Sequence, residues 1–148
     1  MLLDTDILID LLRGNKGARD FLYSLSEDSP HYCSAITVAE IHSGMRETER
    51  QKTSEFIESL IVLPVTKVIA EMAGEFRRNY RNTRESPRGE NADRKTTRSR
   101  FSGELKENEL ELDDCLIAAT AVCEGMEFAS RNVRQYPMTE VRLRPAKY

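Results

Sequence analysis

Acidic side chains stand at three points along the chain where they could support phosphodiester chemistry. Asp4 directly follows an apolar start, Glu40 lies near the beginning of an expected helix, and Asp114 precedes a strongly apolar run. Apolar flanks draw Asp4 and Asp114 toward the interior, where an unpaired carboxylate is costly. Carboxylates that meet there repel one another, and their pKa values rise unless cations neutralise them.

A divalent cation is the simplest way to neutralise such a group of acids. No lysine or arginine lies within the first twelve residues or within 110–122, so a local basic partner is missing from both segments. Mg²⁺ prefers oxygen ligands, takes one or two carboxylates directly and keeps several waters. Carboxylate-bound Mg²⁺ that activates water is a recurrent arrangement for phosphodiester cleavage. The acids therefore predict a metal-dependent hydrolytic site.

Each of these acids also has a purely structural interpretation, because acids and hydroxyls cap helices and amides occupy turns. The alternatives are Asp6 or Thr5 as cap of the first helix, Thr37 with Glu40 as a capping box, Asp113 as cap of the apolar helix with Asp114 beside it, and Asn132 as a turn residue. Taken one at a time, the structural interpretation is favoured for each residue. Taken together, the acids favour a common site.

Short strands alternate with helices along the chain, which predicts where these residues meet. The expected strands are 2–3, 31–36, 61–65, 128–130 and 141–143, and the expected helices are 6–13, 16–25, a helix opening at Thr37, 49–60, a long helix capped by Thr66, and an apolar helix closed by Gly125. This alternation implies an α/β fold with a central parallel sheet flanked by helices. In such sheets ligands bind at the carboxyl ends of the strands.

Periodicity fails over residues 81–109, which are polar, highly charged and broken by proline and glycine. We expect this segment to be a loop or mobile arm, with helical turns as an alternative within it, since it is too long for an ordinary connection. From Arg77 to Arg100 there are nine basic and three acidic residues, a net charge of +6 in a chain whose net charge is −3. A basic arm on an acidic body is typical of a protein that meets a polyanion, although such an insertion is as often a solvated loop.

Composition excludes several classes. The 148 residues suit a single domain, and no apolar run approaches the length of a membrane-spanning helix. The start of the chain lacks the basic and apolar regions of a signal peptide, and three cysteines without a Cys-x-x-Cys pair argue against a disulfide scaffold or zinc knuckle. Two histidines leave little material for a histidine-based site. We therefore expect a cytoplasmic protein.

Four segments resemble one known family. In order along the chain they read MLLDTDILIDLLRG, ITVAEIHSG, DDCLIAATAVCEG and SRNVRQYP. Their order and approximate spacing are similar to the PIN-domain family, and specifically to VapC-type toxin ribonucleases of toxin–antitoxin pairs. The likeness covers nearly the whole chain except 81–109. It implies one PIN-like domain over 1–148, with 81–109 as an insertion.

The resemblance also implies a function and a set of site residues. It implies a Mg²⁺-dependent endoribonuclease, with Mn²⁺ as substitute, that cuts RNA with an activated water. Asp4 and Asp114 would bind the metal and Glu40 would complete the acidic triad. The neighbouring residues assigned to support this triad are Thr5, Asp6, Asp113 and Thr120. Such toxins usually dimerise, and a cognate antitoxin inserts a peptide into the acidic groove.

Two departures from the family pattern affect these expectations. Asn132 stands where many members carry a fourth acid, so the site has less negative charge and would hold a second metal more weakly. The other departure is the basic insertion, since relatives usually connect these helices by a short turn. The residues expected to grip RNA phosphates or an acidic antitoxin are Arg77, Arg78, Arg81, Arg84, Arg94, Lys95, Arg98 and Arg100.

Two other functions remain open from the residues alone. Asn132 and the long insertion also suit a non-catalytic PIN-like module that binds RNA or a partner without cutting it. The opening Asp4-Thr-Asp6 resembles the start of haloacid-dehalogenase-type phosphatases, in which the first aspartate is the nucleophile and the second aspartate acts as an acid. That family expects Thr or Val two residues after the second acid, where this chain has Leu8, and a downstream Gly-Asp that is missing.

Overall fold

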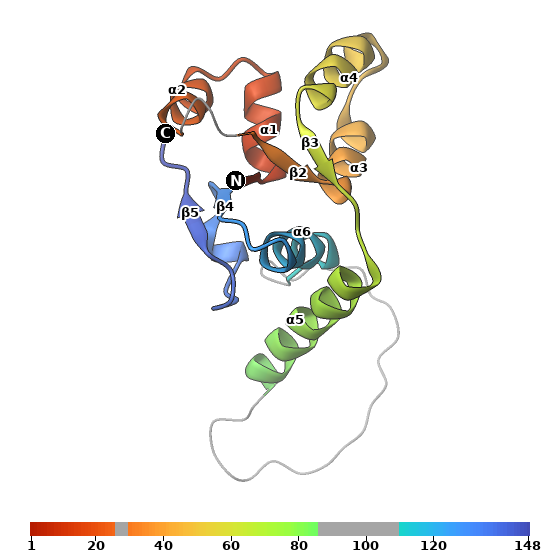
Figure 1. Cartoon of the computed structure of the whole chain (residues 1–148), viewed down its shortest axis with the longest axis vertical. Helices are drawn as coiled ribbons and strands as arrows, with labels where there is room; N and C mark the ends of the chain where they lie inside the picture. The colour runs from red at the N-terminus through yellow and green to blue at the C-terminus, as the bar shows by residue number, and fades with distance from the viewer. Residues whose placement is uncertain (26–29, 86–109) are drawn as a thin grey trace.

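Five short strands form a parallel sheet at the centre of the molecule (Figure 1). The structure is a computed structural model that describes residues 1–25, 30–85 and 110–148. The strands are β1 (Leu2–Leu3), β2 (Tyr32–Ser34), β3 (Ile61–Leu63), β4 (Phe128–Ser130) and β5 (Leu143–Pro145). Their order across the sheet is β3-β2-β1-β4-β5, and every neighbouring pair is parallel. The predicted α/β class with a central parallel sheet is confirmed.

Helices connect these strands and cover both faces of the sheet (Figure 1). They are α1 (Thr5–Leu12), α2 (Lys16–Ser24), α3 (Ala35–Gly44), α4 (Arg50–Glu58), α5 (Lys67–Glu85) and α6 (Leu112–Cys123), with 3₁₀ turns η1 (Glu47–Glu49) and η2 (Val133–Gln135). Gly14 and Gly125 follow α1 and α6 with φ angles of 76° and 64°. This left-handed backbone favours glycine, which explains why both helices end where the sequence indicated.

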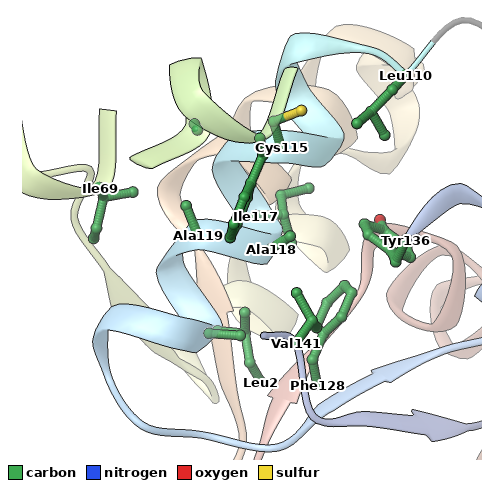
Figure 2. Close-up of a cluster of buried hydrophobic side chains, with 13 residues drawn as sticks. Leu2, Ile69, Leu110, Cys115, Ile117, Ala118, Ala119, Phe128, Tyr136 and Val141 are labelled. Atoms are coloured by element: carbon green, nitrogen blue, oxygen red, sulfur yellow. The ribbon is translucent and has the colours of Figure 1, made fainter. Parts of the chain in front are cut away.

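Alternation along the strands divides the apolar side chains between two cores. Leu2 and Phe128 face the side covered by α5 and α6, and Figure 2 shows them with Tyr136 and Val141 beneath α6. Leu3 and the next residue of β4, Ala129, face the opposite side, where they pack with residues of α1 to α4. Successive side chains of a strand point to opposite faces, so two adjacent leucines suffice to anchor both layers.

The parallel sheet brings the carboxyl ends of β1, β2 and β4 to one edge. Asp4 follows β1, Ser34 ends β2 and begins α3, and Ser130 ends β4 just before Asn132. The backbone N–H of Asp4 donates to the carbonyl of Ala129 at 2.9 Å, which fixes the end of β1 against the end of β4. This edge is where ligands bind in parallel sheets, and it holds the acids singled out from the sequence.

Several predicted element boundaries were wrong, most of them by one or two residues. The strand expected over 31–36 stops at Ser34, and α3 begins at Ala35 because the Ser34 hydroxyl accepts the N–H of Ile36 and caps the helix. The last strand is displaced from 141–143 to Leu143–Pro145, since Leu143 is the residue that pairs with Phe128. Strand β5 lies at the edge of the sheet, where a proline is tolerated.

The third correction concerns the basic segment. Helix α5 continues to Glu85, so residues 81–85 are helical and not part of a loop. No glycine or proline interrupts the sequence between Gly74 and Pro87, which lets the helix run on. Residues 86–109 lie outside the described residues, and their predicted character stays a prediction. No helix of the described segments is long and apolar enough to cross a membrane.

Candidate active site

Asp4 is a buried acid at the centre of the candidate site. Its side chain is 4% exposed, and its Oδ1 accepts the N–H of Thr5 at 2.8 Å, so Asp4 itself is the N-cap of α1. Its other oxygen, Oδ2, accepts a hydrogen bond from the hydroxyl of Tyr136 at 2.9 Å. The expectation that Thr5 or Asp6 caps this helix was wrong. Contacts at both oxygens fix the orientation of the Asp4 carboxylate.

Asp114 faces Asp4 from the first turn of α6. Its Oδ1 lies 3.4 Å from the same Tyr136 hydroxyl oxygen, so one phenol contacts both carboxylates. The N-cap of α6 is Glu111, which means that the alternative of Asp113 as helix cap was wrong. Asp113 is exposed, whereas Asp114 is only partly exposed and turned toward the site. The structure therefore distinguishes the two adjacent acids.

Glu40 reaches the site from the second turn of α3. The Thr5 hydroxyl donates to its Oε2, and the buried Thr37 hydroxyl lies 3.2 Å from that of Thr5. A capping box of Thr37 and Glu40 is excluded, because α3 begins at Ala35 with Ser34 as its cap. Glu40 is thus tied through Thr5 to the residue next to Asp4, although 36 positions separate the two acids in the sequence.

The three acids share an environment that disfavours negative charge. Burial, followed by the nearby charge of Asp6, raises the pKa of Asp4 to about 7. Burial and the charges of Glu111 and Glu40 raise the pKa of Asp114 to about 6. Burial also raises the pKa of Glu40. In the described part of the chain, burial and neighbouring acids are the main causes that raise these three pKa values, so a bound cation would relieve both.

These donors fit a hard divalent cation. The site offers carboxylate oxygens, which Mg²⁺ and Mn²⁺ prefer, and burial makes neutralisation by a cation favourable. Among the described residues, no three ligating side chains already stand together at one point. Because Mg²⁺ usually takes only one or two protein carboxylates and fills its remaining positions with water, a facing pair such as Asp4 and Asp114 is enough.

The turn after β4 is held by a second set of contacts. The backbone N–H of Arg131 donates to Asp6 Oδ2 at 3.0 Å, and its guanidinium pairs with Asp10 on α1. Tyr148 donates to the same Asp10 at 3.0 Å and lies under the Arg131 guanidinium, 5.3 Å from ring centroid to Cζ. Asp6 therefore positions this turn, and Arg131 is directed to Asp10 and away from the candidate metal pair.

Asn132 and Thr120, two other predicted site residues, are held by hydrogen bonds of their own. Asn132 has an exposed side chain, and its backbone N–H donates to the Ser130 hydroxyl. Thr120 is buried and hydrogen bonds to the carbonyl of Leu116, with the Ser34 hydroxyl 3.4 Å away. Roles for Asn132, Asp113 and Thr120 at the metal stay predictions.

Four of the basic residues singled out lie on α5, and four are outside the described residues. Those on the helix are Arg77, Arg78, Arg81 and Arg84; the others are Arg94, Lys95, Arg98 and Arg100. Arg78 forms an ion pair with Glu75 at 3.9 Å. Helix α5 packs along α6, and the charge of Arg77 acts on Cys115, the residue next to Asp114. Contact with RNA or an antitoxin stays a prediction for all eight residues.

Sequence reasoning missed Tyr136 and the role of Asp10. The residues from Asn132 to Tyr136 have the pattern of a turn before Pro137, and nothing in local spacing shows that the Tyr136 hydroxyl meets acids at positions 4 and 114. A tyrosine that becomes buried must find a partner for its hydroxyl, but the polar segment around Tyr136 gives no sign that it is buried. Asp10 stands in the apolar run of α1, where a charged residue also calls for a partner.

The fold and the site together define a PIN-type protein. A family model described as PIN domain matches residues 1–140, and the chain belongs to the PIN-domain family. Ribonuclease VapC10 of Mycobacterium tuberculosis is 36% identical over 145 residues, covering 98% of this chain and 91% of that protein. Ribonuclease VapC19 of the same organism is 30% identical over 138 residues, covering 93% and 92%.

Solved structures agree on the fold. A toxin–antitoxin complex from Klebsiella pneumoniae contains a chain that matches with a TM-score of 0.68 at 23% identity, covering 99% of this chain and 97% of that one. The similarity confirms the single α/β domain. Membership of the PIN family also decides against the haloacid-dehalogenase alternative for the opening Asp4-Thr-Asp6.

The position of Glu40 makes a testable prediction. Replacing Glu40 with Gln should lower RNA cleavage about as strongly as loss of a metal ligand, with little change in unfolding free energy, because Glu40 caps no helix. Ser34→Ala is the control, since removal of a helix cap costs about 0.5–2 kcal/mol. Cleavage assays and urea unfolding of both variants would check this. A Glu40→Gln protein that cleaves like the wild type would contradict it.

Proposed function

We propose that this chain is a Mg²⁺-dependent endoribonuclease and the toxin of a toxin–antitoxin pair, with Mn²⁺ as a substitute metal. The carboxylates of Asp4 and Asp114, which share contact with the Tyr136 hydroxyl, carry this proposal, because acids whose pKa values are raised by burial and by neighbouring acids are suited to a hard metal ion. The named relatives are ribonucleases of the VapC type and are similar over almost the full chain, which supports RNA as substrate.

Each site residue has a distinct role in the proposed reaction. Asp4 and Asp114 would hold the ion, and a bound Mg²⁺ supplies an activated water and stabilises the leaving oxygen. Glu40 orients the attacking water with one carboxylate oxygen while Thr5 occupies the other. Asn132 is proposed as a neutral oxygen ligand or a contact to the substrate, and Thr120 and Asp113 as supporting residues near the acids.

The proposed partners follow from the same relatives and from charge. The Klebsiella match is a toxin–antitoxin complex, which supports a cognate antitoxin as a partner of this chain. A homodimer and a cytoplasmic location are proposed with it. The basic residues between Arg77 and Arg100 would add phosphate contacts to RNA, or would receive an acidic antitoxin.

The decisive experiment is a digest of total cellular RNA with the purified full chain in Mg²⁺, Mn²⁺ or EDTA. We expect discrete fragments with either metal and none in EDTA, and the ends of the fragments would identify the cleaved RNA. Retention of RNA without cleavage under every condition, weakening steeply as salt rises, would instead support the non-catalytic binding module. The same assay therefore separates the two functions.

A further inference from the structure

Tyr136 contacts both acids of the proposed metal pair through a single atom. Its hydroxyl oxygen lies 2.9 Å from Asp4 Oδ2 and 3.4 Å from Asp114 Oδ1. The residue is 2% exposed, so this hydroxyl is withdrawn from bulk water. A buried phenol needs a hydrogen-bond partner, and here the acceptors are the two carboxylates themselves.

The ring of Tyr136 is fixed by packing. It meets the ring of Phe128 edge to face, with centroids 4.7 Å apart and an interplanar angle of 85°. Figure 2 shows the two rings together with Val141, below Ala118 of α6. Its backbone N–H also donates to the carbonyl of Val133, the first residue of η2. The hydroxyl is therefore held in place by the core and cannot swing away without disturbing it.

The hydrogen bond to Asp4 completes the orientation of that carboxylate. Thr5 N–H binds Oδ1 and Tyr136 binds Oδ2, and the Ser130 side chain is a further hydrogen-bond partner of this carboxylate. A hydroxyl carries one hydrogen, so at any moment the Tyr136 hydroxyl donates either to Asp4 or to Asp114. Outer hydrogen-bond partners of this kind orient metal-binding carboxylates, and their loss typically costs about 10–100-fold in metal affinity or activity.

We propose that Tyr136 is a positioning residue that holds the carboxylates of Asp4 and Asp114 in the arrangement a divalent cation requires. This inference rests on the proposed function, because it takes these two acids as the metal ligands. Tyr136 would act on the metal through its two neighbours and would not itself bind substrate. Its substitution should therefore weaken metal binding in protein that contains no RNA.

The test is direct Mn²⁺ binding to the metal-depleted full chain, measured by electron paramagnetic resonance of the free ion. Tyr136→Phe keeps the ring and removes only the hydroxyl, and we expect its Kd for Mn²⁺ to rise about tenfold. Tyr148→Phe is the matched control, because it removes another tyrosine hydroxyl bonded to a carboxylate, that of Asp10. Its Kd should equal that of the wild type.

The outcomes separate this inference from the proposed function. If Tyr136→Phe unfolds at a lower temperature yet binds Mn²⁺ as tightly as the wild type, the hydroxyl is merely structural and the inference fails. If the wild type itself binds no Mn²⁺, the proposed function fails. If Asp114→Asn binds Mn²⁺ like the wild type, the assignment of the metal ligands fails.

A second measurement needs no variant at position 136 to fold. Mg²⁺ bound between Asp4 and Asp114 must alter the surroundings of the phenol that touches both. We expect Mg²⁺ to produce a tyrosine difference spectrum in the near ultraviolet in the wild type and in Tyr148→Phe, but not in Asp114→Asn. A flat difference spectrum from protein that is saturated with Mg²⁺ would overturn the inference.

Discussion

We expect Asp114→Asn to reduce RNA cleavage by at least about a thousandfold and to leave the protein folded, and we expect the same of Asp4→Asn. Loss of a charged ligand removes the interactions that hold the metal. The metal supplies several kcal/mol of transition-state stabilisation. Each tenfold change in rate corresponds to about 1.4 kcal/mol. Asn keeps the size of Asp. At position 4 it also remains a good helix cap, so α1 should persist in the variant.

The chain supplies a matched control for this prediction. Asp113 is adjacent to Asp114 and carries the same charge, but it is exposed and its carboxylate is not the one that meets Tyr136. Asp113→Asn should therefore lower cleavage far less than Asp114→Asn, since Asp113 is proposed to support the site and not to hold the metal. Cleavage rates at saturating Mg²⁺, with circular dichroism to verify folding, would measure all three variants. Full activity in Asp4→Asn or Asp114→Asn would refute the proposed mechanism.

The second large effect is on stability, and its sign follows from the raised pKa of Asp4. In the folded protein this pKa is about 7, whereas an unfolded chain has an aspartate pKa near 3.9. Between about pH 4 and pH 7 the folded state thus keeps a proton that the unfolded state has lost. Metal-free protein should lose stability as pH rises through this window and then level off above it.

The size of this effect can be measured against an isosteric variant. About 1.4 kcal/mol accompanies each pKa unit, so Asp4 alone would contribute a loss on the order of 2–4 kcal/mol between pH 4 and pH 7. In Asp4→Asn that contribution disappears, and the difference in unfolding free energy between variant and wild type should grow across the window. Urea unfolding in EDTA at several pH values would show it.

A divalent cation should reverse the loss above pH 7. A ligand that binds only the folded state stabilises it by about 2.7 kcal/mol at a hundred times its Kd. Mg²⁺ should therefore raise the unfolding free energy of the wild type and have almost no effect on Asp4→Asn. If the unfolding free energy does not change between pH 4 and pH 7 in EDTA, the raised pKa of Asp4 in the folded protein is contradicted.

Local patterns in the sequence predicted the elements well because each carries its own signal. Two apolar residues followed by an acid indicated β1, and glycines at 14 and 125 marked the ends of α1 and α6. Boundaries that depend on a partner were harder to place. Strand β5 begins at Leu143 because of its pairing with Phe128, and the local run from Val141 does not reveal that register.

The candidate site was predicted unevenly for a similar reason. Asp4, Glu40 and Asp114 could be singled out because an acid beside apolar residues is conspicuous in a sequence. The contacts that tie them together come from Thr5 and Tyr136, and Tyr136 lies 132 positions from Asp4 in the sequence. Only the folded chain shows that Ser34 caps α3, which frees Glu40 from the structural role that its spacing from Thr37 had suggested.

The position of β1 in the sheet has a consequence for the order in which the protein folds. Strand β1 precedes the other strands in the sequence, yet it is the central strand and pairs with β4, so that Leu2 and Leu3 lie opposite Phe128 and Ala129. Pairings of such long sequence separation form late and slowly, because a large loop must close first. A chain that stops short of Ser130 carries all three acids, but it lacks β4 and also Tyr136, which contacts both Asp4 and Asp114. The candidate site can therefore assemble only after this later part of the chain has joined the sheet, and we expect truncation before β4 to abolish metal binding.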